Sequence, residues 1–172
     1  MVTLIPMEEQ HIRQCAEIDT YRLIKDEDDL PDDKNACINS LIRIRIDGVA
    51  NYFRGFIGHK DRFAYCILEN NQLVGYITAV EMPDKSCGTT IYIDEIRIAW
   101  DEQQKGYGTA ALEQFFSLFN SKQMFSLITE KELPAYHVYQ KLKFYDYGDV
   151  RYMTRSSISE IMQKMETIAE EE

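Results

Sequence analysis

Residues 91–119 read IYIDEIRIAWDEQQKGYGTAALEQFFSLF, and this stretch decides the fold. Apolar residues alternate up to Ile98 and predict a β-strand over 89–98, and an amphipathic pattern predicts a helix over 107–120. A polar loop that contains Gly106 and Gly108 joins the two. The first N–H groups of such a helix have no partner within it and lie at the positive end of the helix dipole. The sequence therefore predicts an anion site that suits a phosphate group.

Two well-known phosphate-binding motifs fit this loop less well. A Walker A loop is excluded because no Gly-Lys-Ser/Thr ends it. The dinucleotide pattern G-x-G-x-x-G/A does match residues 106–111, and Glu130 lies where a ribose-binding acid would sit. However, the polar residues 99–105 separate the strand from the first glycine. The 42 residues after Glu130 are also too few for the rest of a doubly wound sheet.

The remaining elements follow from periodicity and turn chemistry. Strands are expected at 2–6, 63–68, 73–80, 124–129, 144–147 and 150–154, and helices at 8–24, from 36 to the region of Gly55, at 133–142 and at 156–169. Residues 69–72, Glu-Asn-Asn-Gln, suit a hairpin turn, and residues 83–88 interrupt the next pair of strands. The Ile-Arg alternation at 42–46 would also suit a strand instead of a helix.

These elements predict an α/β fold with a mixed central sheet flanked by helices. The connections between the strands at 63–68, 73–80 and 89–98 are too short for a crossover, so these strands form an antiparallel meander. The helix at 107–120 makes a right-handed crossover, which sets the next strand parallel to the one before it. We expect one domain over residues 1–172, in which 155–172 adds a C-terminal helix. Its apolar stripe packs on its own domain or, in a second interpretation, against another copy in a homodimer.

Composition and charge narrow the functional class. The chain has 172 residues, of which 45% are hydrophobic, and its net charge is −10. Such a charge argues against non-specific nucleic-acid binding and is compatible with a cationic substrate. The four cysteines are widely spaced, so we expect reduced thiols and no metal site. The sequence shows no secretory leader and no apolar run long enough to span a membrane, which predicts a cytoplasmic protein without a membrane partner.

Two blocks of the sequence resemble the GNAT superfamily of N-acetyltransferases. Ile96-Arg97-Ile98, followed by Gln103-x-x-Gly106-x-Gly108, is similar to the family's acetyl-CoA signature, Q/R-x-x-G-x-G/A behind a splayed strand. Residues 138–144, VYQKLKF, look like the family's L-Y-x-K-x-G-F block. The resemblance covers about residues 2–154. It implies a GNAT-like fold, in which the parallel pair of strands is splayed.

The resemblance also implies acetyl-CoA as the cosubstrate, without a metal. Backbone N–H groups of the glycine loop would hold the pyrophosphate, and the Ile98 amide would stabilise the oxyanion of the attacked thioester. The residues implied in binding acetyl-CoA are Ile96, Ile98, Gln103, Gln104, Lys105, Gly106, Tyr107, Gly108 and Thr109. Two positions depart from the family pattern: Lys143 stands where glycine is usual, and Glu132 stands where an asparagine often contacts the cofactor.

The implied reaction needs one group that accepts a proton and one that donates a proton. The attacking amine must lose a proton, and Glu95 is our first candidate for the base, with Asp94 or a chain of water molecules as alternatives. Strand alternation predicts that Asp94 and Glu95 lie on opposite faces of the sheet. The leaving thiolate must gain a proton, and Tyr139, which matches the family's tyrosine by position, suits a general acid.

We therefore expect an N-acetyltransferase that moves an acetyl group from acetyl-CoA to a primary amine of a small cationic molecule, by direct attack in a ternary complex. Residues 26–33 carry six carboxylates and either recognise that cation or are solvated. A protein N-terminus or a lysine is the alternative acceptor. From another functional class, the chain could be a CoA-binding sensor or interaction module without catalysis.

Overall fold

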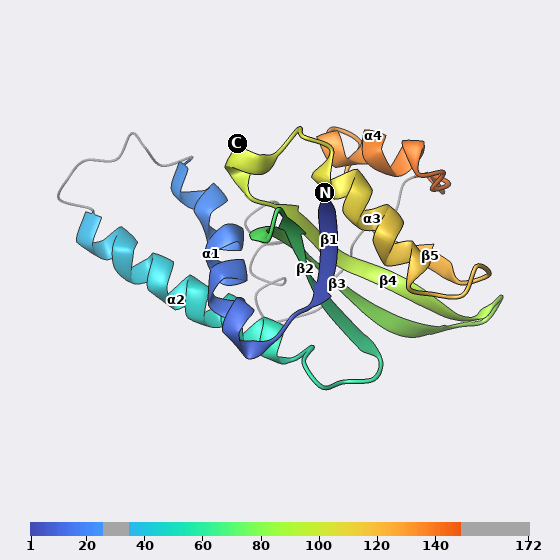
Figure 1. Ribbon diagram of the computed structural model, residues 1–172, viewed down its shortest axis with the longest axis horizontal. Helices are drawn as coiled ribbons and strands as arrows, with labels where there is room; N and C mark the ends of the chain where they lie inside the picture. The colour runs from blue at the N-terminus through green and yellow to red at the C-terminus, as the bar shows by residue number, and fades with distance from the viewer. Residues whose placement is uncertain (26–34, 149–172) are drawn as a thin grey trace, which may run out of the picture. The chain divides into compact units, whose positions relative to one another are not determined.

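The computed structural model describes residues 1–25 and 35–148, and within them the central feature is a five-stranded sheet (Figure 1). The strands lie side by side in chain order as β1 (Val2–Pro6), β2 (Arg62–Glu69), β3 (Gln72–Asp84), β4 (Gly88–Ile98) and β5 (Met124–Ser126). Strands β1 to β4 pair antiparallel, and β4 pairs with β5 in parallel. The predicted mixed sheet is confirmed.

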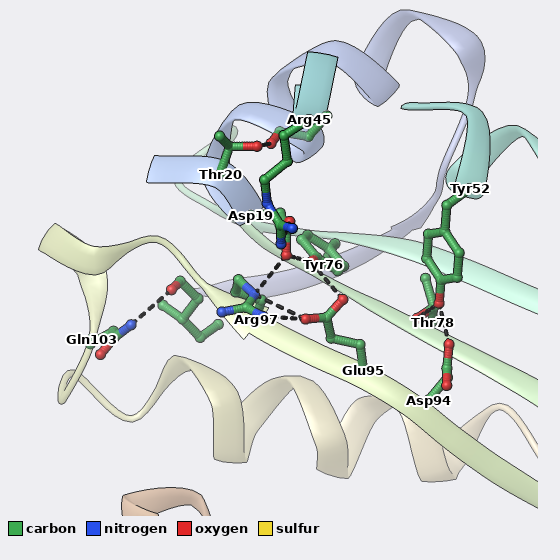
Figure 2. Close-up of polar contacts among 12 residues, drawn as sticks. Asp19, Thr20, Arg45, Tyr52, Tyr76, Thr78, Asp94, Glu95, Arg97 and Gln103 are labelled. Carbon is green, nitrogen blue, oxygen red and sulfur yellow. Dashed lines mark hydrogen bonds and ion pairs between the residues drawn. The ribbon is translucent and has the colours of Figure 1, made fainter. Parts of the chain in front are cut away.

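Helices cover both faces of this sheet. They are α1 (Glu9–Lys25), α2 (Asn35–Arg54), the 3-10 turn η2 (Trp100–Glu102), α3 (Tyr107–Ser117) and α4 (Pro134–Lys141). Helices α1 and α2 lie on one face, and α3 and α4 lie on the other (Figures 1 and 2). The helix expected from 36 to the region of Gly55 is confirmed as α2, and residues 42–46 are helical and do not form a strand. None of the helices in the described part of the chain is long and apolar enough to cross a membrane.

The chain divides into two compact units, residues 1–142 and 143–172, and the sheet and all these helices belong to the first. In the second unit only residues 143–148 are described. The acidic residues 26–33, the expected strand at 150–154 and the expected C-terminal helix lie outside the described residues. The expectation of a single domain stays a prediction.

Each face of the sheet has its own apolar core. Beneath α1 and α2, the buried side chains of Ile12, Cys15, Phe53 and Cys66 pack together with Tyr76. On the other face α3 buries Ala111, Leu112 and Phe115. The Phe115 ring lies at the centre of a cluster of aromatic side chains from β2, α3, β5 and the residues after α3, namely Tyr65, Phe116, Phe119 and Phe125. Cys15, Cys66 and Cys87 are free thiols, as expected.

The two hairpins differ in how well the sequence predicts them. Asn70 and Asn71 adopt left-handed conformations, with φ of 50° and 63°, and form the expected turn between β2 and β3. The interruption expected at 83–88 is shorter, because β3 extends to Asp84 and β4 begins at Gly88. Pro83 can lie in β3 because β2 only begins at Arg62, opposite Val80, so β3 has no neighbour on that side at Pro83.

Two other expectations about strands are wrong. No strand forms at 144–147, where Tyr145 and Tyr147 are largely exposed and the Asp146 carboxylate accepts the Gly148 N–H at 2.8 Å in a local turn. Strand β5 ends at Ser126 rather than at 129, because its ladder with β4 stops there. In both segments apolar residues suit a strand, but no described strand pairs with them.

A side chain covers the outer edge of β1. The Gln114 amide of α3 accepts a hydrogen bond from the Leu4 N–H at 3.2 Å and donates one to the Val2 carbonyl at 2.7 Å. These contacts with residues on either side of Thr3 reproduce the pattern that one residue of a parallel strand would make. Pro6, at the next outward position, has no N–H to offer. The edge is thus protected from pairing with another chain.

We expect Gln114→Met to lower the free energy of unfolding by about 1–3 kcal/mol, because it leaves the Leu4 N–H and the Val2 carbonyl without partners. Glu113→Met, at the exposed neighbouring position of the same helix, is the matched control and should change stability little. Urea denaturation measures both. Equal stability of the two variants would show that the amide contributes nothing to the edge.

Candidate active site

Strand β4 separates from β5 before its own end. The two strands pair only through Thr90–Met124, Ile91–Phe125 and Tyr92–Ser126, whereas β4 continues to Ile98. Beyond Tyr92, the side of β4 that faces β5 therefore has no strand beside it among the described residues. The predicted splayed pair of strands is present.

The backbone groups near the end of β4 can be assigned to its two sides. The Ala99 N–H donates to the Val74 carbonyl at 2.8 Å, so it points toward β3. The Arg97 carbonyl points the same way, because a Cβ added at Gly75 would lie 2.2 Å from it. Backbone groups alternate along a strand, so those of Ile96 and Ile98 point to the open side. An extended ligand with amide groups could pair with β4 at this place.

The glycine loop connects this open edge to the start of α3. Gly106 is the N-cap of α3 and has φ of 82°, a left-handed conformation that glycine adopts without strain. It offers no side-chain cap, so the first N–H groups of the helix remain available to an anion. Gln104 has φ of 61°, which is strained for a residue with a side chain. The loop thus combines two left-handed residues with a helix start that no side chain caps.

The side chains of the loop make bonds within it. The Gln103 amide turns back and donates to the Ile98 carbonyl at 3.2 Å, so it ties the loop to the end of β4 (Figure 2). The Lys105 ammonium lies 2.8 Å from the Glu102 carboxylate. This hydrogen bond raises the pKa of Lys105, which therefore keeps its positive charge beside the loop.

Gly108, in the first turn of α3, is not required by the packing of the protein. A Cβ added there would meet only Ile98, at an ordinary contact distance of 3.7 Å. Glycine in a helix costs about 1 kcal/mol relative to alanine. Packing within the chain therefore does not explain the glycine at this position.

A β-bulge changes the expected placement of the two candidate bases. Glu95 pairs with Thr78 and Ile93 pairs with Ala79, so Asp94 is one extra residue in β4. Asp94 and Glu95 both make contacts on the face that carries α1 and α2 (Figure 2). The expectation that they lie on opposite faces is wrong, because strict alternation fails at a bulge.

Glu95 belongs to an ion-pair network on this face. Its Oε1 accepts hydrogen bonds from Arg97, with Nε at 3.0 Å, and its Oε2 accepts one from the Tyr76 hydroxyl at 2.8 Å. Asp19 of α1, which is only 5% exposed, joins the same network through Arg97 Nε at 3.2 Å, the Tyr76 hydroxyl at 3.0 Å and Arg45 at 3.0 Å. Two carboxylates are thus balanced by two guanidinium groups.

The network shifts the pKa values of Tyr76 and Arg97. Burial, together with the charges of Glu95 and Asp19, raises the pKa of the Tyr76 hydroxyl, which remains a hydrogen-bond donor. Burial has the largest single effect and lowers the pKa of Arg97, but the charges of its neighbours, led by Glu95, and the hydrogen bond to Glu95 together outweigh it and the pKa rises. Arg97 therefore stays positively charged.

Asp94 contacts a different element. The Tyr52 hydroxyl of α2 donates to Asp94 Oδ2 and lies 3.0 Å from the Thr78 hydroxyl of β3. Burial and the hydrogen bond to Asp94 raise the pKa of Tyr52. Asp94 itself is exposed. The bulge therefore presents two carboxylates with unlike surroundings.

The predicted general acid lies on a separate helix. Tyr139 is half-buried on α4, and burial raises its pKa, which keeps the phenol protonated. Lys143, which follows this helix in the position of the family glycine, has φ of 65°. The position thus keeps the backbone conformation of a glycine although the residue has changed. Glu132 is exposed.

Sequence reasoning missed the residues that hold the carboxylates, namely Asp19, Arg45, Tyr52, Tyr76, Thr78 and Arg97. One signal was available. Asp19 continues the apolar helical stripe of Ile12, Cys15 and Ala16, and a carboxylate in such a stripe requires a buried partner. The partners themselves come from β3, β4 and α2, so the sequence contains no local pattern that joins them.

Comparisons with known proteins agree with this geometry. The sequence of residues 28–144 matches the model of a family described as the acetyltransferase (GNAT) family. No curated protein matches the chain closely enough to count as a relative.

Several solved structures share the fold. A predicted acetyltransferase with acetyl-CoA from Clostridium acetobutylicum has 17% identity and a TM-score of 0.60, and the match covers 90% of this chain and 96% of that one. An aminoglycoside N-acetyltransferase in complex with CoA has 12% identity and a TM-score of 0.63, with 90% and 95% covered. An aminoglycoside acetyltransferase from an uncultured soil sample, in complex with sisomicin, has 13% identity and a TM-score of 0.57, with 90% and 97% covered.

The two arginines of the network should differ in their contribution to stability. Arg97→Met should lower the free energy of unfolding by about 2–3 kcal/mol, because it leaves buried Asp19 and half-buried Glu95 without their shared cation. Arg45→Met, which removes a more exposed partner of Asp19, should cost less than about 1 kcal/mol. Urea denaturation compares them, and equal losses would contradict the role given to Arg97.

Proposed function

Since the chain belongs to the acetyltransferase (GNAT) family, we propose that it transfers an acetyl group from acetyl-CoA to a primary amine of a small cationic molecule. The proposal rests on two features of the structure that meet at Ile98. The open backbone edge of β4 ends there, and the Gln103 amide ties the glycine loop to the Ile98 carbonyl. One site suits the extended amide-containing arm of CoA, and the other suits its pyrophosphate.

The residues of this chain would bind acetyl-CoA mainly through backbone groups. The N–H groups from Gln104 to Thr109 would hold the pyrophosphate at the start of α3. Ile96 and Ile98 would pair with the amides of the arm, and Lys105 would add a positive charge. Because Gly108 has no side chain, the phosphates can approach the helix closely.

The reaction needs three further contributions. The Ile98 N–H would stabilise the negative charge that develops on the thioester oxygen. Tyr139, which burial keeps protonated, would donate a proton to the departing thiolate. Glu95, the first candidate, or Asp94 would accept a proton from the amine, directly or through water; both lie on the face opposite α3.

The choice of a small cationic acceptor rests on two observations. The chain has a net charge of −10, which attracts cations. Similar structures include aminoglycoside acetyltransferases, one of them in complex with sisomicin. A protein N-terminus or a lysine side chain remains the second candidate within the same chemistry.

A thiol-release assay with acetyl-CoA tests the function. The acceptors are sisomicin, spermidine and a lysine-containing peptide with a free N-terminus. Turnover that is faster with the small cations supports the proposal, and faster turnover with the peptide favours the protein acceptor. Binding of CoA without turnover on any acceptor would instead indicate a CoA-binding sensor or interaction module.

Gly108→Ala should separate cofactor binding from stability. We expect the free energy of unfolding to stay equal or to rise by up to about 1 kcal/mol, because the new methyl group has room and alanine favours a helix. The affinity for CoA, measured by calorimetry, should fall because the methyl group occupies the approach to the helix. Unchanged affinity would mean that the pyrophosphate does not bind at this turn.

Tyr139→Phe should lower kcat by about 100-fold or more, because the thiolate then leaves without a positioned proton donor. The affinity for CoA should change little. Steady-state kinetics with the best acceptor, together with calorimetry, distinguishes the two effects. Turnover at the rate of the unmodified protein would remove Tyr139 from the mechanism.

A further inference from the structure

The two carboxylates of the β4 bulge differ in how many of their oxygens are engaged. Both oxygens of Glu95 accept hydrogen bonds, one from Arg97 and the other from Tyr76. Protonation of Glu95 would remove the negative charge that Arg97 faces in a half-buried place. Glu95 is thus built into the network that joins β4 to Asp19 of α1.

The Asp94 carboxylate accepts a hydrogen bond at only one of its oxygens. Its Oδ2 accepts the hydroxyl of Tyr52, and its Oδ1 has no partner among the described residues. No cation pairs with it in that part of the chain. The titratable groups beside Asp94 are Tyr52 of α2 and Glu95 of its own strand. Glu95 in turn contacts Arg97 and Tyr76, and both of these contact Asp19. Asp94 is also exposed, so an incoming molecule can reach it.

Tyr52 fixes the orientation of this carboxylate. A carboxylate only accepts, so the Tyr52 hydroxyl must donate to Asp94, and the buried Thr78 hydroxyl, 3.0 Å away, must donate to Tyr52. The Tyr52 ring is held in turn by Phe56 and Phe53, with ring centroids at 4.9 and 5.5 Å. A chain of donors that starts in the sheet therefore ends at Asp94 Oδ2 and leaves Oδ1 open.

Given the acetyl transfer proposed above, on which this assignment rests, we infer that Asp94 is the carboxylate that receives the acceptor's amine and that Tyr52 is its positioning residue. Glu95 then serves to hold β4 against α1. The β-bulge allows Asp94 and Glu95 to have different roles at one site, because it brings both carboxylates to one face of the sheet.

The proton balance of the step is as follows. The ammonium of the acceptor gives one proton to Asp94 Oδ1 and becomes a neutral amine. Its nitrogen attacks the thioester carbon, the C–N bond forms and the C–S bond breaks. Tyr139 gives its proton to the leaving sulfur and takes one up from solvent, to which the nitrogen releases its second proton. The products are an amide and the free thiol, and the proton on Asp94 returns to solvent.

Kinetics of four variants test the assignment with the acceptor of the panel that turns over fastest. Asp94→Asn should lower kcat/KM for the amine by about 100-fold or more, and Tyr52→Phe by roughly 10-fold, with KM for acetyl-CoA unchanged. The double variant should be no slower than Asp94→Asn alone, because Tyr52 acts through Asp94. Tyr65→Phe, on the α3 face beside Phe115, is the matched control and should retain full activity.

The outcomes separate this assignment from the function on which it rests. No turnover in the unmodified protein with any amine overturns both. If the unmodified protein turns over and Asp94→Asn keeps its full kcat, the assignment of Asp94 is overturned but the proposed function is not. A double variant whose loss is the product of the single losses also overturns the assignment alone, because Tyr52 would then act independently of Asp94. Glu95→Gln should lose less activity than Asp94→Asn, and the reverse order would return the role to Glu95.

Discussion

The separation of β4 from β5 beyond Tyr92 and Ser126 is the constraint on which the rest of the structure depends. A parallel pair requires a crossover, and here the crossover is α3, which begins just after β4 ends. Past Tyr92, the backbone groups on the open side of β4 have no strand to pair with among the described residues. Gln103 satisfies the Ile98 carbonyl from within the chain. The remaining backbone N–H and C=O groups on the open side of β4 could pair with a ligand.

The same strand serves a second purpose on its other side. Up to Ile93 it alternates regularly and buries Ile91 and Ile93, and then the bulge at Asp94 turns two consecutive carboxylates to the face of α1 and α2. Gly75 allows this part of β4 to lie close to β3, since any side chain there would collide with the Arg97 carbonyl. A donor that binds along the open edge and an acceptor that approaches the carboxylates would therefore meet at one strand.

A feature of this structure could be predicted from the sequence where neighbouring residues determine it, and not where contacts between distant segments do. The strand, loop and helix at 91–119 follow from periodicity and glycine placement within one stretch, and so does the hairpin at Asn70 and Asn71. The bulge could not be predicted, because the register of β4 is set by its pairing with β3 and a single extra residue reverses every alternation beyond it. The missing strand at 144–147 failed for a related reason: apolar residues alone do not supply a neighbour.

The network around Asp19 also changes how the acidity of the chain bears on its substrate. A net charge of −10 suggests an acidic site, yet of the three carboxylates Asp19, Asp94 and Glu95, Arg45 and Arg97 neutralise two. Long-range attraction of a cation depends on the total charge of the protein. Recognition of that cation depends instead on a carboxylate oxygen that accepts no hydrogen bond from the protein. Among Asp19, Glu95 and Asp94, that oxygen is Oδ1 of Asp94. In the proposed function, selectivity for an amine would therefore depend more on which carboxylates the protein neutralises internally than on how many it carries.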